Sequence, residues 1–388
     1  MNTDSAAVLV VDDVAENRDL LVRRLKRLGI ADVEQATNGI EALAAIGRRN
    51  FDVVLLDIMM PELDGFGVLE RLKAEGKVND LPIIVISALN EIDPIVRCIE
   101  LGAEDFIFKP FNPILLRARV LATLEKKLLR DRTREELRRK QRELNEARTL
   151  QLALVPPKFS ETVAGRHVSI DVVLEPAKEV GGDLVDHFRL SDNKIVVALG
   201  DVSDKGAGAA LMMARTHSLV RGLSSRPDAP DLFGAPEKAL NIVNAALAAG
   251  NETCMFVTFL LAVLDLADNR LTYVRAGHVP PFLRRADGSI ERLSHAGGLP
   301  LGMMEGTVYK ATTVGFDRGD ALLVLTDGFT EAADLGEALF GEARIEQYLA
   351  AHDPRSPGLL EALVGEVRTF EAGQPAFDDM AAVLLSLT

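Results

Sequence analysis

The sequence predicts two folded domains of different class joined by one long helix. In the first part of the chain, short β-branched apolar runs alternate with amphipathic stretches, which predicts an α/β doubly wound sheet of five parallel strands. In the last part, many strand-like runs and a few grouped helical runs predict an α+β sandwich of β-sheets flanked by helices. The stretch between them has no glycine and is too polar to pack on a globular core, which predicts a long coiled-coil helix.

The first domain is expected over residues 6–122. Three of its apolar runs are continuous, as in strands that are buried on both faces, and a fourth is shorter. These runs are VLVV at 8–11, VVLL at 53–56, IIVI at 83–86 and FIF at 106–108. Helical patterns lie between them, at 17–29 and 39–49.

Polar side chains stand where these strands end. Asp12 and Asp13 follow the first strand, Asp57 ends the third, Ser87 ends the fourth and Lys109 follows the fifth. The carboxyl ends of parallel strands meet at one edge of a sheet, so these five side chains should converge. Three carboxylates would repel one another unless a cation neutralises them. The pattern therefore favours Mg²⁺ with a phosphoryl group, one carboxylate being the acceptor.

The first domain resembles the receiver domain of two-component response regulators. The matching segments are VVDD at 10–13, LLDIMMPELDG at 55–65, ISA at 86–88 and FIFKPF at 106–111. The resemblance implies a flavodoxin-like fold, phosphorylation of Asp57 by a histidine kinase or another phosphodonor, and a cis bond before Pro110. The Mg²⁺ ligands that it implies are Asp12, Asp13, Asp57 and the Met59 carbonyl. The switch residues that it implies are Ser87, Phe106 and Lys109, the last in contact with the phosphate.

Residues 123–156 are expected to form the helical coiled-coil linker. Leu137, Leu144 and Gln151 recur at intervals of seven, a stripe too narrow for a globular core. A single helix standing in solvent is the alternative, and the excess of Lys and Arg also allows an RNA-binding arm. Mixed charges on a helix are more typical of a solvated face than of an RNA-binding arm. The narrow stripe of Leu137 and Leu144 favours a coiled coil and hence a homodimer.

The second domain is expected over residues 157–388. Its strand-like runs lie at 169–176, 194–201, 256–266, 270–277, 320–328 and 381–388. Its helical runs lie at 208–223, 236–249, 341–352 and 357–371. The stretch ALGDVSDKGAGAAL, at 198–211, can be a phosphate-cradling loop, a metal site or a plain turn between a strand and a helix.

Other acidic residues in similar settings favour the metal site. Asp183, Asp201, Asp327 and the pair Asp378-Asp379 lie beside apolar runs or glycines. A carboxylate at such a place is costly unless it is capped, paired or bound to metal. The absence of a His/Cys cluster and the carboxylate donors favour Mg²⁺ or Mn²⁺ over zinc. Two such ions bridged by a shared carboxylate can activate water and hold a phosphoryl group.

The second domain resembles the SpoIIE-type branch of the PP2C family of metal-dependent serine/threonine protein phosphatases. The matching segments are ARTLQLALVPP at 147–157, EVGGDLVDHF at 179–188, ALGDVSDKG at 198–206, RAGHVPPFL at 275–283, GGLPLGM at 297–303, LVLTDGFTEA at 323–332 and FDDMAAVLL at 377–385. The resemblance implies two Mn²⁺ or Mg²⁺ ions bridged by Asp201. The further ligands that it implies are Asp183, the Val202 carbonyl, Asp327 and Asp378, with Asp379 as the alternative to Asp378.

The sequence does not decide the roles of four further residues near this site. Asp204 stands where the family has glycine, and it can add a ligand, repel phosphate or cap the next helix. Lys205 is a candidate contact for substrate. His278 either lies in a loop at the site or only stabilises a turn. Ala381 stands where the family has threonine, which removes a hydroxyl beside the last aspartate pair.

The two resemblances together predict a response regulator whose output is a phosphoserine/phosphothreonine phosphatase. The substrate that they imply is a phosphorylated STAS-domain anti-anti-sigma factor. The alternative is a non-catalytic adaptor that sequesters a sigma-factor regulator under receiver control. The net charge of −14 disfavours nucleic-acid partners, and no basic recognition helix follows the first domain.

Composition also bears on location. No apolar run reaches the roughly 18 residues of a membrane span, and the first residues do not resemble a signal peptide. The two cysteines, Cys98 and Cys254, lack metal-ligand spacing, and Cys254 is expected to be a core thiol. We therefore expect a cytoplasmic protein without membrane contact.

Overall fold

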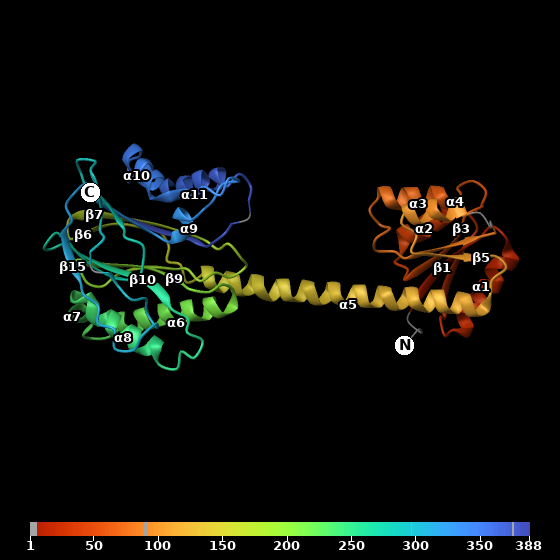
Figure 1. Ribbon diagram of the computed structural model, residues 1–388, viewed down its shortest axis with the longest axis horizontal. Coiled ribbons are helices and arrows are strands. Elements are labelled where there is room, and N and C mark those ends of the chain that lie inside the picture. Colours follow the sequence, from red (N-terminus) through yellow and green to blue (C-terminus); the bar gives the residue numbers. More distant parts are fainter. Residues whose placement is uncertain (1–5, 89–91, 296, 375) are drawn as a thin grey trace. The chain divides into compact units, whose positions relative to one another are not determined.

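The computed structural model describes residues 6–88, 92–295, 297–374 and 376–388. The chain divides into two compact units, Met1–Lys140 and Gln141–Thr388 (Figure 1). No helix in the described ranges combines the length and the apolar character needed to cross a membrane.

The first unit is the predicted doubly wound sheet. Its strands are β1 (Ala7–Val11), β2 (Asp32–Ala36), β3 (Val53–Asp57), β4 (Ile83–Ser87) and β5 (Asp105–Phe108). They are all parallel, in the order β2-β1-β3-β4-β5. The helices are α1 (Ala15–Arg27), α2 (Gly39–Arg48), α3 (Gly65–Ala74) and α4 (Ile92–Glu100). This sheet therefore has the order of a flavodoxin-like fold.

The three central strands explain why their sequence runs are continuously apolar. Every residue of β1, β3 and β4 is buried, because each strand packs against helices on both faces. Leu9 and its alternate neighbours face one apolar cluster, and Val8 and Val10 face the other. The edge strand β2, with the sequence DVEQA, is mostly outside both clusters.

One helix, α5 (Pro113–Leu152), is 40 residues long. Its first turns belong to the core of the first unit, where Leu116, Val120 and Leu124 are buried. From there most side chains are exposed, and Leu137 retains 62% of its accessible surface. Burial returns at Gln151, which is only 5% exposed. The long helix is thus observed, whereas its pairing as a coiled coil stays a prediction.

The second unit is a sandwich of two six-stranded sheets. One has the order β14-β11-β10-β9-β8, with β15 also paired to β11, and the other has the order β13-β12-β16-β17-β7-β6. The strands of the first are β8 (Leu184–Arg189), β9 (Lys194–Val202), β10 (Val257–Asp265), β11 (Arg270–Ala276), β14 (Gly297–Gly298) and β15 (Thr312–Gly315). Those of the second are β6 (Phe159–Val163), β7 (Arg166–Glu175), β12 (Phe282–Arg284), β13 (Ile290–Arg292), β16 (Ala321–Leu325) and β17 (Met380–Leu387).

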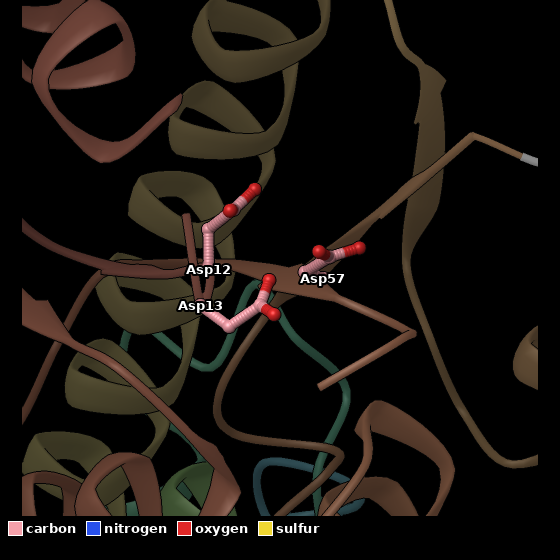
Figure 2. A group of neighbouring side chains, drawn as sticks. All are labelled: Asp12, Asp13 and Asp57. Carbon is pink, nitrogen blue, oxygen red and sulfur yellow. The ribbon is translucent and has the colours of Figure 1, made fainter. Parts of the chain in front are cut away.

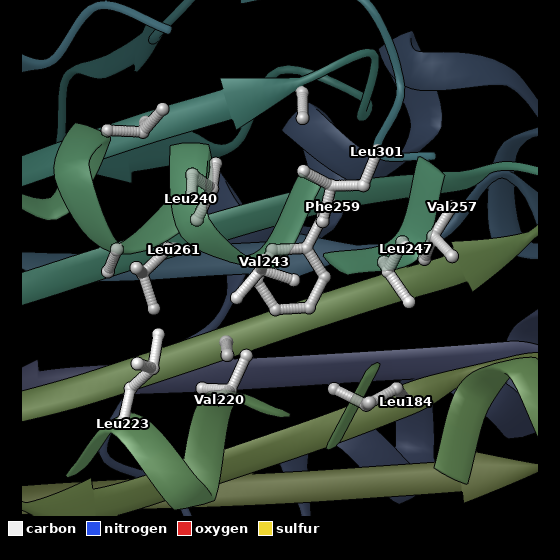
Figure 3. Close-up of a cluster of buried hydrophobic side chains, with 14 of the residues drawn as sticks. Leu184, Val220, Leu223, Leu240, Val243, Leu247, Val257, Phe259, Leu261 and Leu301 are labelled. Carbon is white, nitrogen blue, oxygen red and sulfur yellow. The ribbon is translucent and has the colours of Figure 1, made fainter. Parts of the chain in front are cut away.

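Helices cover the outer face of each sheet. The helices α6 (Ala207–Ser224), α7 (Ala229–Gly234) and α8 (Pro236–Ala248) cover the first sheet. Figure 3 shows side chains of α6 and α8, such as Val220 and Leu240, meeting Phe259 and Leu261 of β10. The helices α9 (Asp327–Thr330), α10 (Gly341–Ala351) and α11 (Leu359–Phe370) cover the second sheet. A third apolar cluster fills the space between the two sheets.

Two sequence expectations in this unit were wrong. The run at 320–328 does not stay extended, because β16 ends at Leu325 and Asp327 begins the short helix α9. Cys254 is exposed in a loop with a φ of 54°, outside the core, whereas Cys98 is buried. The loop between α8 and β10 keeps Cys254 at the surface.

Candidate functional site

The first acidic centre lies at the carboxyl edge of the parallel sheet. Oxygens of Asp12, Asp13 and Asp57 lie within 4.8 Å of one another, and Figure 2 shows the three side chains gathered there. Asp12 and Asp57 are buried and Asp13 is exposed, so the centre is open on one side. It is the only group of three His, Cys, Asp or Glu residues that meets this spacing within the described ranges.

Lys109 supplies a positive charge to this centre. Its Nζ lies 2.8 Å from Asp12 Oδ2 and 2.7 Å from Asp57 Oδ2. Burial raises the pKa of Asp57, although Lys109 partly offsets that effect. Burial opposes the charge on Lys109, but hydrogen bonds to Asp12 and Asp57 raise its pKa overall. One ammonium against three carboxylates leaves an excess of negative charge, which fits a hard divalent cation.

The other predicted residues of this centre lie around Asp57. Ser87 is buried at the end of β4. The backbone of Met59 is hydrogen bonded to the Asp57 carboxylate, and the Met59 side chain is exposed. Phe106 is half-buried on β5 and packs edge-to-face on Phe108, with ring centroids 5.3 Å apart. The predicted cis bond before Pro110 is confirmed.

The second acidic centre lies at one end of the space between the two sheets of the sandwich. On each contributing strand, alternate residues face this space, for example Val185 on β8, Leu199 on β9, Val324 on β16 and Ala381 on β17. Side chains two residues apart on a strand point to the same face. The residues two positions beyond these apolar ones are Asp183, Asp201, Thr326 and Asp379. The strand pattern therefore directs four polar side chains from four segments to one place.

Asp183, which is buried, and Asp201, which is half-buried, are neighbours in this centre. The pairing of Leu184 with Gly200 sets them side by side, and their carboxyl groups are hydrogen bonded to each other. Burial, followed by the Asp201 and Asp379 carboxylates, raises the pKa of Asp183 well above its usual range. Burial and the nearby Asp327 carboxylate raise the pKa of Asp201 to about 7. A cation in contact with both groups would remove this penalty.

Asp327 and Asp378 are half-buried members of this centre. Burial and the Glu331 carboxylate, with a further effect of Asp378, raise the pKa of Asp327 to about 6. Asp378 Oδ2 lies 3.0 Å from Lys205 Nζ, and its Oδ1 accepts a hydrogen bond from the Asp379 amide. Four acidic groups therefore gather here, and the Lys205 ammonium pairs with Asp378, so the excess of negative charge again fits hard divalent cations.

The two aspartates of the pair have different surroundings. Asp379 accepts backbone N–H groups with both oxygens, from Ala177 at 2.7 Å and from Gly182 at 2.7 Å. It is 7% exposed, and it fixes the loop that leads to Asp183. Asp378 keeps a more accessible carboxylate beside Asp327. The geometry thus favours Asp378 over Asp379 as the ligand from this pair.

Two family models match the chain, one for each unit. A family model described as Stage II sporulation protein E (SpoIIE) matches residues 191–388, just over half of the 388 residues. The chain belongs to the SpoIIE family. A second family model, the response regulator receiver domain, matches residues 8–121. The first unit is therefore a receiver domain, and the second is a SpoIIE-type domain of the PP2C class.

Individual relatives match parts of the chain. Protein IcfG of Synechocystis is 28% identical over 262 residues, which are 62% of this chain and 41% of that protein. The probable transcriptional regulator ycf27 of Porphyridium aerugineum is 43% identical over 119 residues, which are 31% of this chain and 48% of that protein. The chain thus spans about half the length, or less, of these curated relatives.

A solved structure has the fold of the second unit. The SiaA-PP2C domain of Pseudomonas aeruginosa superimposes with a TM-score of 0.54 at 18% sequence identity. The superposition covers 65% of this chain and 98% of that domain. At this identity the match establishes the shared PP2C fold and nothing more.

A residue that sequence analysis missed ties the SpoIIE-type centre together. Thr326 is fully buried, and its hydroxyl donates to Asp183 Oδ2 at 2.9 Å while accepting the Ala381 amide at 3.0 Å. It also directly precedes Asp327. One hydroxyl therefore orients segments that carry three candidate ligands. The only sequence signal was a polar residue that continues the inward-facing alternation of β16.

The remaining candidates of the SpoIIE-type domain differ in their distance from this centre. Gly182 lies against Val202, and a Cβ on Gly182 would come within 3.2 Å of the Val202 carbonyl oxygen. Asp204 is exposed and accepts the Lys205 amide, and Gly206, not Asp204, is the N-cap residue of α6. The His278 ring is buried, with Nδ1 3.0 Å from Thr258 Oγ1. Burial lowers the pKa of His278 to about 3, so the ring is neutral and suits a structural role.

Proposed function

We propose that this chain is a phosphorylation-controlled response regulator whose output domain is a metal-dependent phosphoserine/phosphothreonine phosphatase. The observation that carries the proposal is the second acidic centre, where Asp183, Asp201 and Asp327 have raised pKa values because they are buried near other carboxylates. Such a group of acids is costly to a fold unless it binds cations. SpoIIE family membership supports the assignment of those cations to phosphoester hydrolysis.

The proposed ligands of two Mn²⁺ or Mg²⁺ ions are Asp183, Asp201, the Val202 carbonyl, Asp327 and Asp378. When bound, such a pair of ions supplies an activated water and a clamp for phosphoryl oxygens. The carboxylates of both Asp183 and Asp327 are near enough to Asp201 to affect its pKa, which supports Asp201 as the shared ligand. Thr326 and Asp379 hold the ligand-bearing segments in place, and Lys205 offers an ammonium donor to a phosphoryl oxygen.

For the receiver we propose Asp57 as the phosphoacceptor and a histidine kinase or another phosphodonor as its partner. Mg²⁺ would be held by Asp12, Asp13, Asp57 and the Met59 carbonyl, with Lys109 free to pair with the new phosphate. Ser87 and Phe106 would then change position as a unit. The proposed segments are the receiver at 6–122, a dimeric coiled-coil linker at 123–156 and the phosphatase at 157–388.

The substrate we propose is a phosphorylated STAS-domain protein. The test uses the full chain with Mn²⁺ and a serine-phosphorylated STAS protein, and p-nitrophenyl phosphate serves as a second substrate. We expect phosphate release that EDTA abolishes and excess Mn²⁺ restores. Turnover of p-nitrophenyl phosphate but not of the STAS protein would refute this substrate. Tight binding of the STAS protein without turnover of either compound would favour the adaptor.

The proposed dimer has its own test. Leu137 and Leu144 lie one heptad apart on the exposed middle of α5. Sedimentation of the full chain with and without beryllofluoride, a mimic of the phosphoryl group, should detect a dimer in at least one state. Replacement of both leucines by lysine should yield a monomer in both states. A wild-type chain that is monomeric in both states would refute the dimer.

A further inference from the structure

The end of α5 is bonded to the loop that leads to Asp183. Gln151 is 5% exposed, and its amide pairs with the backbone of Gly181 in both directions. Its Nε2 donates to the Gly181 carbonyl at 2.9 Å, and its Oε1 accepts the Gly181 amide at 3.0 Å. This reciprocal pair satisfies buried backbone groups that have no strand partner, so the helix and the loop are held in one geometry.

The same loop is held from its other side by Asp379. The Asp379 carboxylate accepts the amides of Ala177 and Gly182, on either side of Gly181. A Cβ on Gly181 would lie 2.2 Å from Asp379 Oδ2, so this position has no room for a side chain. The loop is therefore clamped between α5 and the carboxylate that adjoins Asp378. A displacement of either clamp moves the backbone two residues from Asp183.

On the basis of the proposed function, we infer that Gln151 is the positioning residue through which α5 sets the place of Asp183. Gln151 touches neither substrate nor metal in this assignment, and it acts through the Gly181 backbone. Because α5 is one continuous helix from Pro113, the helix that begins after the receiver strand β5 is the one that ends at this clamp. The loop at Gly181 thus gives the receiver a physical route to a metal ligand.

Other residues near the end of α5 do not share the contacts of Gln151. Gln141 lies ten residues earlier on the same helix and is exposed, and within the described part of the chain its side-chain hydrogen bonds go to Asn145 and Glu179. Leu150, adjacent to Gln151, is 72% exposed. Gln141 is therefore a matched control, because it has the same side chain but is bonded to the side chain of Glu179, in the same loop, where Gln151 is bonded to the loop backbone.

The test measures Mn²⁺ binding by calorimetry in the full chain. Asp12→Asn with Asp13→Asn removes the receiver site from the titration. In that background we expect Gln151→Met to weaken Mn²⁺ binding by about 10- to 100-fold, as is usual for residues that orient a metal ligand. Gln151→Asn keeps the amide but is one methylene shorter, so we expect a similar loss. Gln141→Met should bind Mn²⁺ within about twofold of its parent.

A second measurement examines regulation with the receiver intact. We expect the ratio of phosphatase activity with and without beryllofluoride to collapse towards one in both Gln151 variants and to persist in Gln141→Met. Folded Gln151 variants that bind Mn²⁺ as the parent does, with only a lower melting temperature, would overturn the inference. If the parent binds Mn²⁺ but hydrolyses nothing, the proposed function fails, whereas the binding test of Gln151 still stands.

Discussion

The two acidic centres of this chain are built in different ways. The receiver centre takes its three carboxylates from the ends of adjacent parallel strands, and Lys109 is bonded to two of them. The SpoIIE-type centre takes its acids from a loop, a strand, a short helix and a turn, and its spacing is more open. Its order depends on supports that are not acidic, such as Thr326 and the Gly181 backbone. The first centre is therefore fixed by the fold, and the second depends on long-range contacts.

The largest effect should follow loss of the shared ligand. Asp201→Asn removes one negative charge where both proposed cations need it, so we expect phosphatase activity to fall on the order of a thousandfold. Hydrolysis of p-nitrophenyl phosphate with Mn²⁺ is the measurement. Asp192→Asn, in the exposed turn before β9, is the control and should retain activity. An Asp201→Asn variant with near-normal turnover would remove the central ligand from the proposal.

The receiver centre should fail independently of the phosphatase centre. Asp57→Asn removes the acceptor oxygen, so phosphoryl transfer from a small donor such as acetyl phosphate should be abolished. Mn²⁺-dependent hydrolysis without donor should stay within about twofold, because additivity holds for sites without shared partners. Intact-mass measurement and phosphatase assays check the two parts. Loss of basal hydrolysis in this variant would contradict the separation of the centres.

Loss of the Thr326 hydroxyl, which positions the ligand-bearing segments, should have an intermediate effect on Mn²⁺ affinity, and only in the second centre. Thr326→Val keeps the shape of the side chain but removes the hydroxyl bonded to Asp183 and Ala381. We expect Mn²⁺ affinity to fall about 10- to 100-fold, with turnover partly recovered at high Mn²⁺. Thr330→Val, which removes a hydroxyl that donates to the Asp327 backbone carbonyl at 3.2 Å, is the matched control. Equal Mn²⁺ affinities in the two variants would show that Thr326 is no support.

The smallest effect is a dependence on pH. The raised pKa values of Asp183 and Asp201, the latter about 7, mean that protons compete with metal below neutral pH. Mn²⁺ affinity at this centre should therefore weaken by about tenfold or more between pH 7.5 and pH 5.5. Calorimetry with the Asp12→Asn, Asp13→Asn background measures this directly. An affinity that is constant over this range would show that the acids are already ionised without metal.

The same pKa shifts determine how the stability of the metal-free protein changes with pH. Folded-state pKa values above the unfolded value near 3.9 mean that protonated aspartates stabilise the native state at low pH. That contribution is present below about pH 4 and is lost as pH rises to about 7, the value for Asp201. Denaturant unfolding with EDTA should show this fall, and saturating Mn²⁺ should remove it. A metal-free domain that becomes more stable between pH 5 and pH 7 would contradict the assignment.

Sequence reasoning succeeded where local pattern and fold coincide. The buried strands of the receiver are continuous apolar runs, so their ends, and with them Asp12 and Asp57, could be placed in advance. The edge strand β2 was not located, because DVEQA lies mostly outside the apolar clusters and carries no such run. Strand β8 was missed for another reason. It includes Asp186, a buried carboxylate that is stable only because Arg221, 35 residues away, donates to both its oxygens.

Gln151 and Thr326, which position the second centre, could not be predicted either, because their partners are also distant in sequence. Gln151 occupies a heptad position with Leu137 and Leu144, and that pattern predicts a helix seam instead of a contact with Gly181. Thr326 contacts Asp183 across 143 residues and Ala381 across 55. A single polar residue in an apolar run does not predict which residues it will contact when those residues are so distant in sequence. Only the folded strands bring them together.

The layering of the sandwich has an evolutionary consequence. Its three packing clusters are made of apolar side chains, and the acids sit at one end of the sheets. Mutations can therefore delete the chemistry one carboxylate at a time while the architecture persists, and each deletion relieves electrostatic strain in the metal-free chain. Homologues that retain the framework but lack its aspartates should arise readily, and they would be pseudoenzymes with a more stable apoprotein.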